Sequence, residues 1–135
     1  MKTTTLLAAA FATLAAGSPT RRCTTTFEEV KFPEGKSNWV GGPGLYPTCV
    51  MAVYHEDYSV KTQEAMIQFA QQECQRLGCV SFMVLSAVPQ DPPERNWYVT
   101  LFGGYPTTPQ DYVQDETKSE AVQDSRAFNA VTNCS

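Results

Sequence analysis

Hydrophobic and polar positions follow strand-like patterns in four segments of the chain. Residues 24–32 are semi-polar and rich in β-forming residues, a pattern that suits an edge strand. Residues 48–54 are apolar on both alternating faces, which predicts a central strand. Residues 80–88 and 97–102 have the same two-faced apolar character and predict two further strands.

A helical pattern lies between the second and third of these strands. From Ser59, a suitable N-cap, to Leu77, apolar residues recur on one face and polar residues, mostly glutamine, occupy the other. Gly78 follows and suits the left-handed conformation in which many helices end. Residues 119–131 show a second helical pattern and predict a C-terminal helix.

Glycine, proline and polar residues fill the segments between these elements. Residues 33–47 predict a loop anchored by Trp39, residues 89–94 a rigid turn, and residues 105–118 a segment on the surface. The order β-β-α-β-β-α predicts an α+β fold. We expect an antiparallel or mixed sheet of about four strands packed on a central helix, with a C-terminal helix and disulfide staples.

The N-terminal segment has the character of an export signal. Lys2 precedes an apolar run over residues 6–16, which is too short to span a bilayer that needs roughly 20 apolar residues. Small residues stand before a cleavage site that follows Gly17. We therefore expect residues 1–17 to be a signal peptide and the protein to be secreted and extracellular.

A dibasic step follows this leader. Arg21 and Arg22 stand directly before Cys23, which predicts a second trimming after Arg22. Residues 18–22 would then be a short pro-segment, and residues 23–135 would form a single secreted α+β domain.

The composition is that of one globular domain with an acidic surface. Of the 135 residues, 42% are hydrophobic and 18% are charged. Cleavage after Arg22 removes three of the 10 basic residues and leaves seven against 14 acidic ones, a net charge of −7. This charge disfavours nucleic acid and anionic lipid as partners, and the basic residues are dispersed along the sequence. We expect no nucleic-acid binding and no membrane insertion.

All five cysteines lie after the expected cleavage site, as in proteins that fold in an oxidising compartment. Several pairings into two bonds are open, and the sequence alone does not choose among them. Cys23 and Cys134 are our first choice, because a bond between the chain ends closes a loop of about 112 residues and contributes roughly 4 to 5 kcal/mol. Cys74 and Cys79 flank a helix stop and suit a local bond. Cys49 would then be a free, small apolar residue in a strand.

Catalytic signatures are weak in this sequence. His55 is the only histidine, and it stands beside Glu56 and Asp57. Neighbouring side chains of an extended chain point to opposite faces, so His55 and Glu56 would not converge as a general-base pair. No serine lies in a G-x-S-x-G turn, and the cysteine spacing lacks the second close pair of a zinc site. We expect no catalytic residue, no metal and no cofactor.

Aromatic residues are the best candidates for a binding surface. Trp39, Trp97, Tyr98 and Tyr105 would offer flat faces for sugar rings, or anchors for a protein partner, if their side chains point outward. Packing in the core and in loops is the alternative for Trp39 and Trp97. The tripeptide from Asn133 to Ser135 fits the N-glycosylation pattern.

The layout of the chain resembles that of small secreted cysteine-containing proteins of filamentous fungi. The resemblance rests on the leader, the dibasic step before Cys23 and the terminal Cys134. The closing stretch over residues 97–129 is similar to the C-termini of secreted ascomycete proteins. Many proteins of this kind are candidate effectors, so the resemblance implies a role in virulence or host interaction.

A second, local resemblance is to PAN/apple modules, which bind proteins or carbohydrates. Residues 74–82 repeat the order of these modules, a helix with a cysteine, a short gap, a second cysteine and an aromatic residue. A strand over residues 97–101 follows, as it does in the modules. The resemblance implies a binding role for an extracellular protein or carbohydrate.

Together these features predict a secreted, non-catalytic interaction protein that binds a host or cell-wall protein or carbohydrate. A small secreted hydrolase of the ribonuclease or glycosidase type is the first alternative, and contact between His55 and a carboxylate in a cleft would favour it. A secreted toxin or inhibitor is the second alternative. The sequence does not give the oligomeric state.

Overall fold

The computed structural model describes residues 21–33, 35–117 and 119–135. The predicted signal peptide and residues 18–20 of the predicted pro-segment lie outside the described residues. The described elements, in chain order, are β1 (Cys23–Glu29), β2 (Trp39–Gly41), β3 (Val50–Asp57), α2 (Gln63–Leu77), β4 (Ser81–Ala87), β5 (Asn96–Phe102), the 3-10 turn η1 (Pro109–Asp111), β6 (Tyr112–Gln114) and β7 (Gln123–Cys134).

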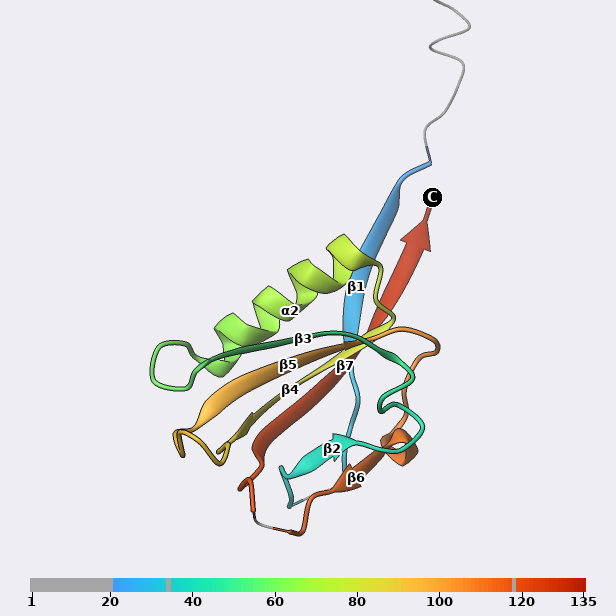
Figure 1. Ribbon diagram of the computed structural model, residues 1–135. Helices are drawn as coiled ribbons and strands as arrows, with labels where there is room; N and C mark the ends of the chain where they lie inside the picture. Colours follow the sequence, from blue (N-terminus) through green and yellow to red (C-terminus); the bar gives the residue numbers. More distant parts are fainter. Residues whose placement is uncertain (1–20, 34, 118) are drawn as a thin grey trace, which may run out of the picture.

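The main sheet has five antiparallel strands in the order β1-β7-β4-β5-β3, and β2 pairs with β6 in a small second sheet. Helix α2 lies along one face of the main sheet, and the β2–β6 sheet lies on the opposite side (Figure 1). The prediction of an α+β fold with an antiparallel sheet packed on a central helix is therefore confirmed. The sheet has one strand more than the four expected.

The predicted C-terminal helix over residues 119–131 is wrong, because residues 123–134 form strand β7. β7 pairs with β1 on one side and with β4 on the other, so its backbone groups are satisfied in two ladders. The register between β4 and β7 shifts between Val84 and Ser86, which marks a bulge. This bulge breaks the two-residue alternation that would have identified a strand.

Two smaller expectations also need correction. Strand β3 was expected to be central, but it is the last strand of the sheet. The helix begins later than expected, because Thr62 rather than Ser59 is its N-cap and accepts a hydrogen bond from the Ala65 N–H at 3.1 Å. Ser59 instead donates its N–H and its hydroxyl to the Asp57 carboxylate, at 3.0 and 2.8 Å.

The main core lies between α2 and the sheet. Met66, Ala70 and other helix residues pack on Phe82, Val99 and Leu101 of β4 and β5, and all five of these residues are at most 4% exposed. Each large apolar side chain buried in this way contributes about 1.5 to 3 kcal/mol. This layer fixes β4 and β5 and therefore also positions the residues on their opposite face.

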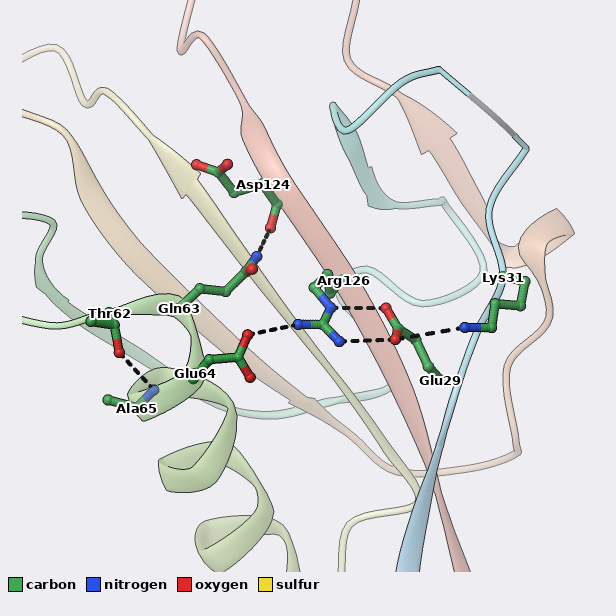
Figure 2. Close-up of polar contacts among 8 residues, drawn as sticks. All are labelled: Glu29, Lys31, Thr62, Gln63, Glu64, Ala65, Asp124 and Arg126. Carbon is green, nitrogen blue, oxygen red and sulfur yellow. Dashed lines mark hydrogen bonds and ion pairs between the residues drawn. The ribbon is translucent and has the colours of Figure 1, made fainter.

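An ion-pair cluster ties the helix to the edge of the sheet (Figure 2). Arg126 on β7 donates two hydrogen bonds to the Glu29 carboxylate on β1, both at 2.9 Å, and a third to Glu64 on α2 at 3.1 Å. Gln63 adds a hydrogen bond from its side-chain amide to the Asp124 carbonyl, at 2.7 Å. Three elements that are distant in sequence are thereby connected at the start of the helix.

Two disulfides join the cysteine pairs that the sequence analysis placed first. Cys23 and Cys134 face each other at the outer end of the β1–β7 ladder, 111 positions apart in sequence. Cys74 and Cys79 link the end of α2 to the chain that leads into β4, and Gly78 between them has a φ of 73°, which favours glycine. Cys49 is free. No α-helix in the described part of the chain is long and apolar enough to cross a membrane.

Candidate binding site

The face of the main sheet opposite α2 carries a groove of about 400 Å³. Its floor comes from strands β3, β4 and β5, and its walls come from β2, the loop after β2 and the chain between β6 and β7. The small β2–β6 sheet packs on the rest of this face through a second apolar cluster. We use the word groove for the surface lined by Val40, Gly41, Tyr46, Val53, Leu85, Ala87, Pro89, Tyr98, Thr100, Asp115, Glu120 and Val122.

The floor of the groove is apolar and aromatic. Val53 is 55% exposed, and Leu85 and Tyr98 are half-buried. Because successive strand residues face opposite sides, Trp97 and Val99 on either side of Tyr98 are buried beneath α2. Alternate side chains of β5 therefore pack in the core, while Tyr98 on the opposite face lines the groove.

Tyr46 forms a wall of the groove in a fixed position. Its hydroxyl is hydrogen-bonded to the Thr100 hydroxyl at 2.8 Å, and its ring meets the ring of Phe102 edge-on at 5.7 Å between centroids. A Cβ at Gly41 would lie 2.5 Å from the Tyr46 ring, so only glycine allows the ring to pack there. Burial raises the pKa of Tyr46 above its ordinary value of 10.0.

Two hydrogen bonds hold the wall that precedes β7. The Val88 N–H donates to the Glu120 carbonyl at 2.6 Å, and the Arg95 guanidinium donates to the Ala121 carbonyl at 2.9 Å. Ala121 has a φ of 46°, a left-handed conformation that costs an alanine about 1 to 2 kcal/mol. The two hydrogen bonds therefore hold the wall in a conformation that the local sequence does not favour.

A buried polar network lies behind this wall. Ser86 is completely buried, donates to the Asp124 carboxylate at 2.8 Å and accepts a hydrogen bond from Arg95 at 2.9 Å. Asp124 has a φ of 60°, which aspartate tolerates better than most residues. Its carboxylate also accepts a hydrogen bond from Tyr58 at 3.5 Å. The network joins β4 to the bulge of β7 and makes the wall part of the rigid sheet.

Apart from its tyrosines, the ionisable residues that line the groove are both acidic. Asp115 accepts hydrogen bonds from the N–H and the hydroxyl of Thr117, at 3.1 and 2.6 Å, and these bonds fix the carboxylate at the rim. Glu120 is exposed and forms no hydrogen bond or ion pair with another described side chain. Lysine, arginine and histidine are missing from the lining residues that the structure describes, and Lys118 lies outside the described residues. The groove therefore favours a ligand that combines apolar surface with positive charge or hydrogen-bond donors.

The four aromatic residues named from the sequence lie in different environments. Tyr98 lines the groove. Trp97 is 4% exposed, stacks on Tyr58 and donates its indole N–H to the Lys61 carbonyl, so it belongs to the core. Trp39 is half-buried and stacks on a phenylalanine of the second apolar cluster. Tyr105 is 39% exposed but is not among the groove residues.

Several groove residues were not singled out in the sequence. Tyr46, Val53, Asp115 and Glu120 come from separate segments, and only the strand order brings them together. One signal was present for Val53, because residues 48–54 are apolar on both faces. That pattern reflects a strand with one face on the core and the other on the groove.

His55 is exposed on β3, with its ring 6.3 Å from the ring of Tyr98 between centroids. Glu56 beside it accepts a hydrogen bond from the Asp57 N–H at 3.1 Å. Within the described residues, no hydrogen bond or ion pair joins His55 to a carboxylate. The contact that would favour the hydrolase alternative is thus not found in that part of the chain.

Comparison with family models, with curated proteins and with solved structures gave no match to this chain. The resemblances to secreted fungal proteins and to PAN/apple modules therefore stay predictions. The function of the chain is accordingly inferred from the geometry of the groove.

Proposed function

We propose that this protein is a secreted, non-catalytic interaction protein that binds a host or cell-wall ligand, protein or carbohydrate, in the groove. The observation that carries the proposal is the combination of Tyr46 and Tyr98, an apolar floor and two carboxylates in one preformed hollow of about 400 Å³. Ligand sites are usually concave, largely apolar and supplied with a few fixed polar groups. The groove has each of these properties.

Rigidity of the walls supports a binding role. Ala121 and Asp124 are the two non-glycine residues with positive φ among the described residues, and both lie in or behind one wall of the groove. Strained backbone that the surroundings hold in place is common at binding sites, because it prepares the site before the ligand arrives. A preformed site loses less conformational entropy on binding.

The disulfides bear on the proposed extracellular location. Two disulfides are compatible with folding in an oxidising compartment. The leader predicted from the sequence agrees with a role outside the cell.

A binding panel tests the proposed function. The purified secreted protein is mixed with insoluble cell-wall polysaccharides and with extracellular host proteins. The affinity of each ligand that binds is then measured for the wild-type protein and for the variants. Tyr98→Ala removes the central aromatic ring of the groove and should weaken binding about tenfold or more, the effect expected for a central aromatic contact. Tyr105→Ala is the matched control, because Tyr105 is an exposed tyrosine outside the groove.

The control variant should bind within about twofold of the wild-type protein. Equal losses in the two variants would place the binding surface elsewhere and contradict the proposed function. Both variants should keep the thermal midpoint of the parent protein within a few degrees, because neither side chain belongs to the clusters of buried residues.

A further inference from the structure

We propose that Asn133 carries an N-linked oligosaccharide, which a transferase of the secretory pathway adds from a polyprenyl-diphosphate donor. Of the asparagines in the chain, Asn133 is the only one followed two positions later by serine or threonine, and the residue between, Cys134, is not proline. The inference rests on the secreted location in the proposed function, because this transferase acts on exported chains. It does not depend on the groove.

The Asn133 side chain is exposed and makes no hydrogen bond with another described residue. Beyond Ala130, strand β7 pairs only with β1, so this end of the strand extends past the rest of the sheet. Asn129 on the same strand differs, because its amide donates to the Thr107 carbonyl at 2.7 Å and accepts from the Thr107 N–H at 2.8 Å. The amide of Asn133 is therefore available for modification without the loss of a contact.

The disulfide at Cys134 and the Asn133 side chain lie on opposite faces of β7. Cys134 is on the same face as Ala130, which packs on the main core beneath α2. Because successive strand residues point to opposite sides, Asn133 lies on the other face, opposite Thr24 of β1, which is also exposed. A glycan on Asn133 therefore meets neither the disulfide nor the helix.

The transfer needs the amide, a nearby hydroxyl and an activated sugar. Nδ2 of Asn133 forms a bond to the anomeric carbon of the donor oligosaccharide, while the bond from that carbon to the diphosphate oxygen breaks. The lipid diphosphate leaves with the electron pair of the broken bond, and the amide loses one proton, so nothing is oxidised or reduced. The hydroxyl that completes the acceptor pattern belongs to Ser135, which is exposed and donates to the Arg22 carbonyl at 3.4 Å.

The glycan lies far from the groove. Val122 lines the groove and stands directly before β7, whereas Asn133 is near the other end of that strand. A strand rises about 3.3 Å per residue, so the attachment point is roughly 30 Å along β7 from the groove. Figure 1 shows the C-terminus at the end of the molecule away from the β2–β6 sheet. The modification should therefore leave ligand binding in the groove unchanged.

Expression of the full chain, with its predicted leader, in a eukaryotic secretory host tests the inference. The secreted protein is weighed by mass spectrometry before and after treatment with peptide N-glycosidase, which removes N-linked sugars and converts the asparagine that carried them to aspartate. We expect most secreted chains to lose mass on treatment, and peptide mapping to find the conversion at position 133.

Variants identify the residues that the transferase requires. Asn133→Gln and Ser135→Ala should each abolish the loss of mass, because the first removes the acceptor amide and the second the hydroxyl. Ser135→Thr keeps the hydroxyl and should keep the glycan. Thr24→Ala is the matched control, because Thr24 is the exposed neighbour of Asn133 across the ladder and lies outside the tripeptide. Since all these side chains are exposed, every variant should fold and be secreted.

The outcomes separate this inference from the proposed function. A secreted wild-type protein without N-linked sugar would overturn the inference and leave the proposed function in place, whereas a chain that stays in the cytosol would contradict both. Peptide mapping without reduction should find the glycan on chains that contain the Cys23–Cys134 bond. A glycan confined to chains with a reduced Cys134 would overturn the inference, because the two groups would then exclude each other.

Discussion

Replacing Glu29 with glutamine tests how the sheet edge and the helix are held together. The Glu29 carboxylate accepts two hydrogen bonds from Arg126, both at 2.9 Å, and the two side chains are 26% and 30% exposed. Hydrogen bonds to charged groups contribute about 1.5 to 3 kcal/mol where solvent is excluded, and partial exposure reduces this value. We expect Glu29→Gln to lower the free energy of unfolding by about 1 to 1.5 kcal/mol at neutral pH, or the thermal midpoint by about 4 to 6 °C.

The pH dependence of this loss follows from the pKa of Glu29. The hydrogen bonds from Arg126 hold the pKa of Glu29 below its ordinary value of 4.5. A carboxyl group whose pKa is lower in the folded protein adds stability that is present above its unfolded pKa and disappears as the pH falls through the folded pKa. The difference between the wild-type protein and Glu29→Gln should therefore be constant above about pH 5.5 and should shrink below about pH 4.5.

Urea denaturation followed by tryptophan fluorescence measures the difference at about pH 7, 4 and 3. Trp97 is buried in the core and reports unfolding. Glu28→Gln is the matched control, because Glu28 is the exposed neighbour of Glu29 on the same strand and has no ion pair among the described residues. Equal losses in the two variants, or a Glu29→Gln loss that stays constant down to about pH 3, would refute the reasoning.

Three further changes have expected outcomes that differ in size and readout. Thr62→Ala removes the oxygen that caps α2 and should cost about 1 kcal/mol in urea denaturation, whereas no loss would contradict the cap. Replacing Cys23 and Cys134 with serine should cost about 4 to 5 kcal/mol, and the same exchange in the disulfide that follows α2 about 2 kcal/mol, because the first closes the longer loop. The reverse order would contradict this model. Arg95→Met leaves the Ala121 carbonyl without its donor, so it should destabilise the protein by about 1 to 3 kcal/mol and speed amide exchange over residues 119–125. Unchanged exchange there would show that another contact holds the wall.

Local sequence patterns predicted the elements whose faces are each either wholly buried or wholly exposed. Helix α2 has one buried face and one polar face, so its period identifies it, and Gly78 marks its end. Strands β4 and β5 are buried on both faces and read as continuous apolar runs. The position of β3 at the sheet edge was not predictable in the same way. One apolar face of β3 packs on the core, and the other lines the groove through Val53. A strand that is hydrogen-bonded to neighbours on both sides has the same two-faced apolar pattern, so the pattern does not distinguish an edge strand from a central one.

The C-terminal strand was mistaken for a helix because of its bulge. Asp124, at the bulge, has a φ of 60° and shifts the phase of the strand. Beyond the bulge both faces are buried, because Phe128 packs in the cluster beneath α2 and Ala127 in the second apolar cluster, so the strand does not alternate between buried and exposed residues. The helix was inferred from the apolar residues Val122, Phe128 and Val131, whose spacings of six and three residues are multiples of three and fit one face of a helix.

The groove itself depends on the order of the strands. Tyr98 was identified from the sequence as a candidate, but its neighbours in the groove come from β3, from the loop after β2 and from the chain before β7. Contacts between such distant segments leave no local pattern in the sequence. Only the fold shows that Tyr98 faces a hollow, whereas Trp97 beside it faces the core.

An NMR titration of the labelled protein tests most directly whether the groove is the binding site. Two probes are added separately: a chitin oligosaccharide and a β-glucan oligosaccharide. The account predicts that every probe that binds shifts the amide signals of Val53, Leu85 and Tyr98 most strongly and leaves those of α2 unchanged. The largest shifts on the exposed face of α2, or at Tyr105, would contradict the account.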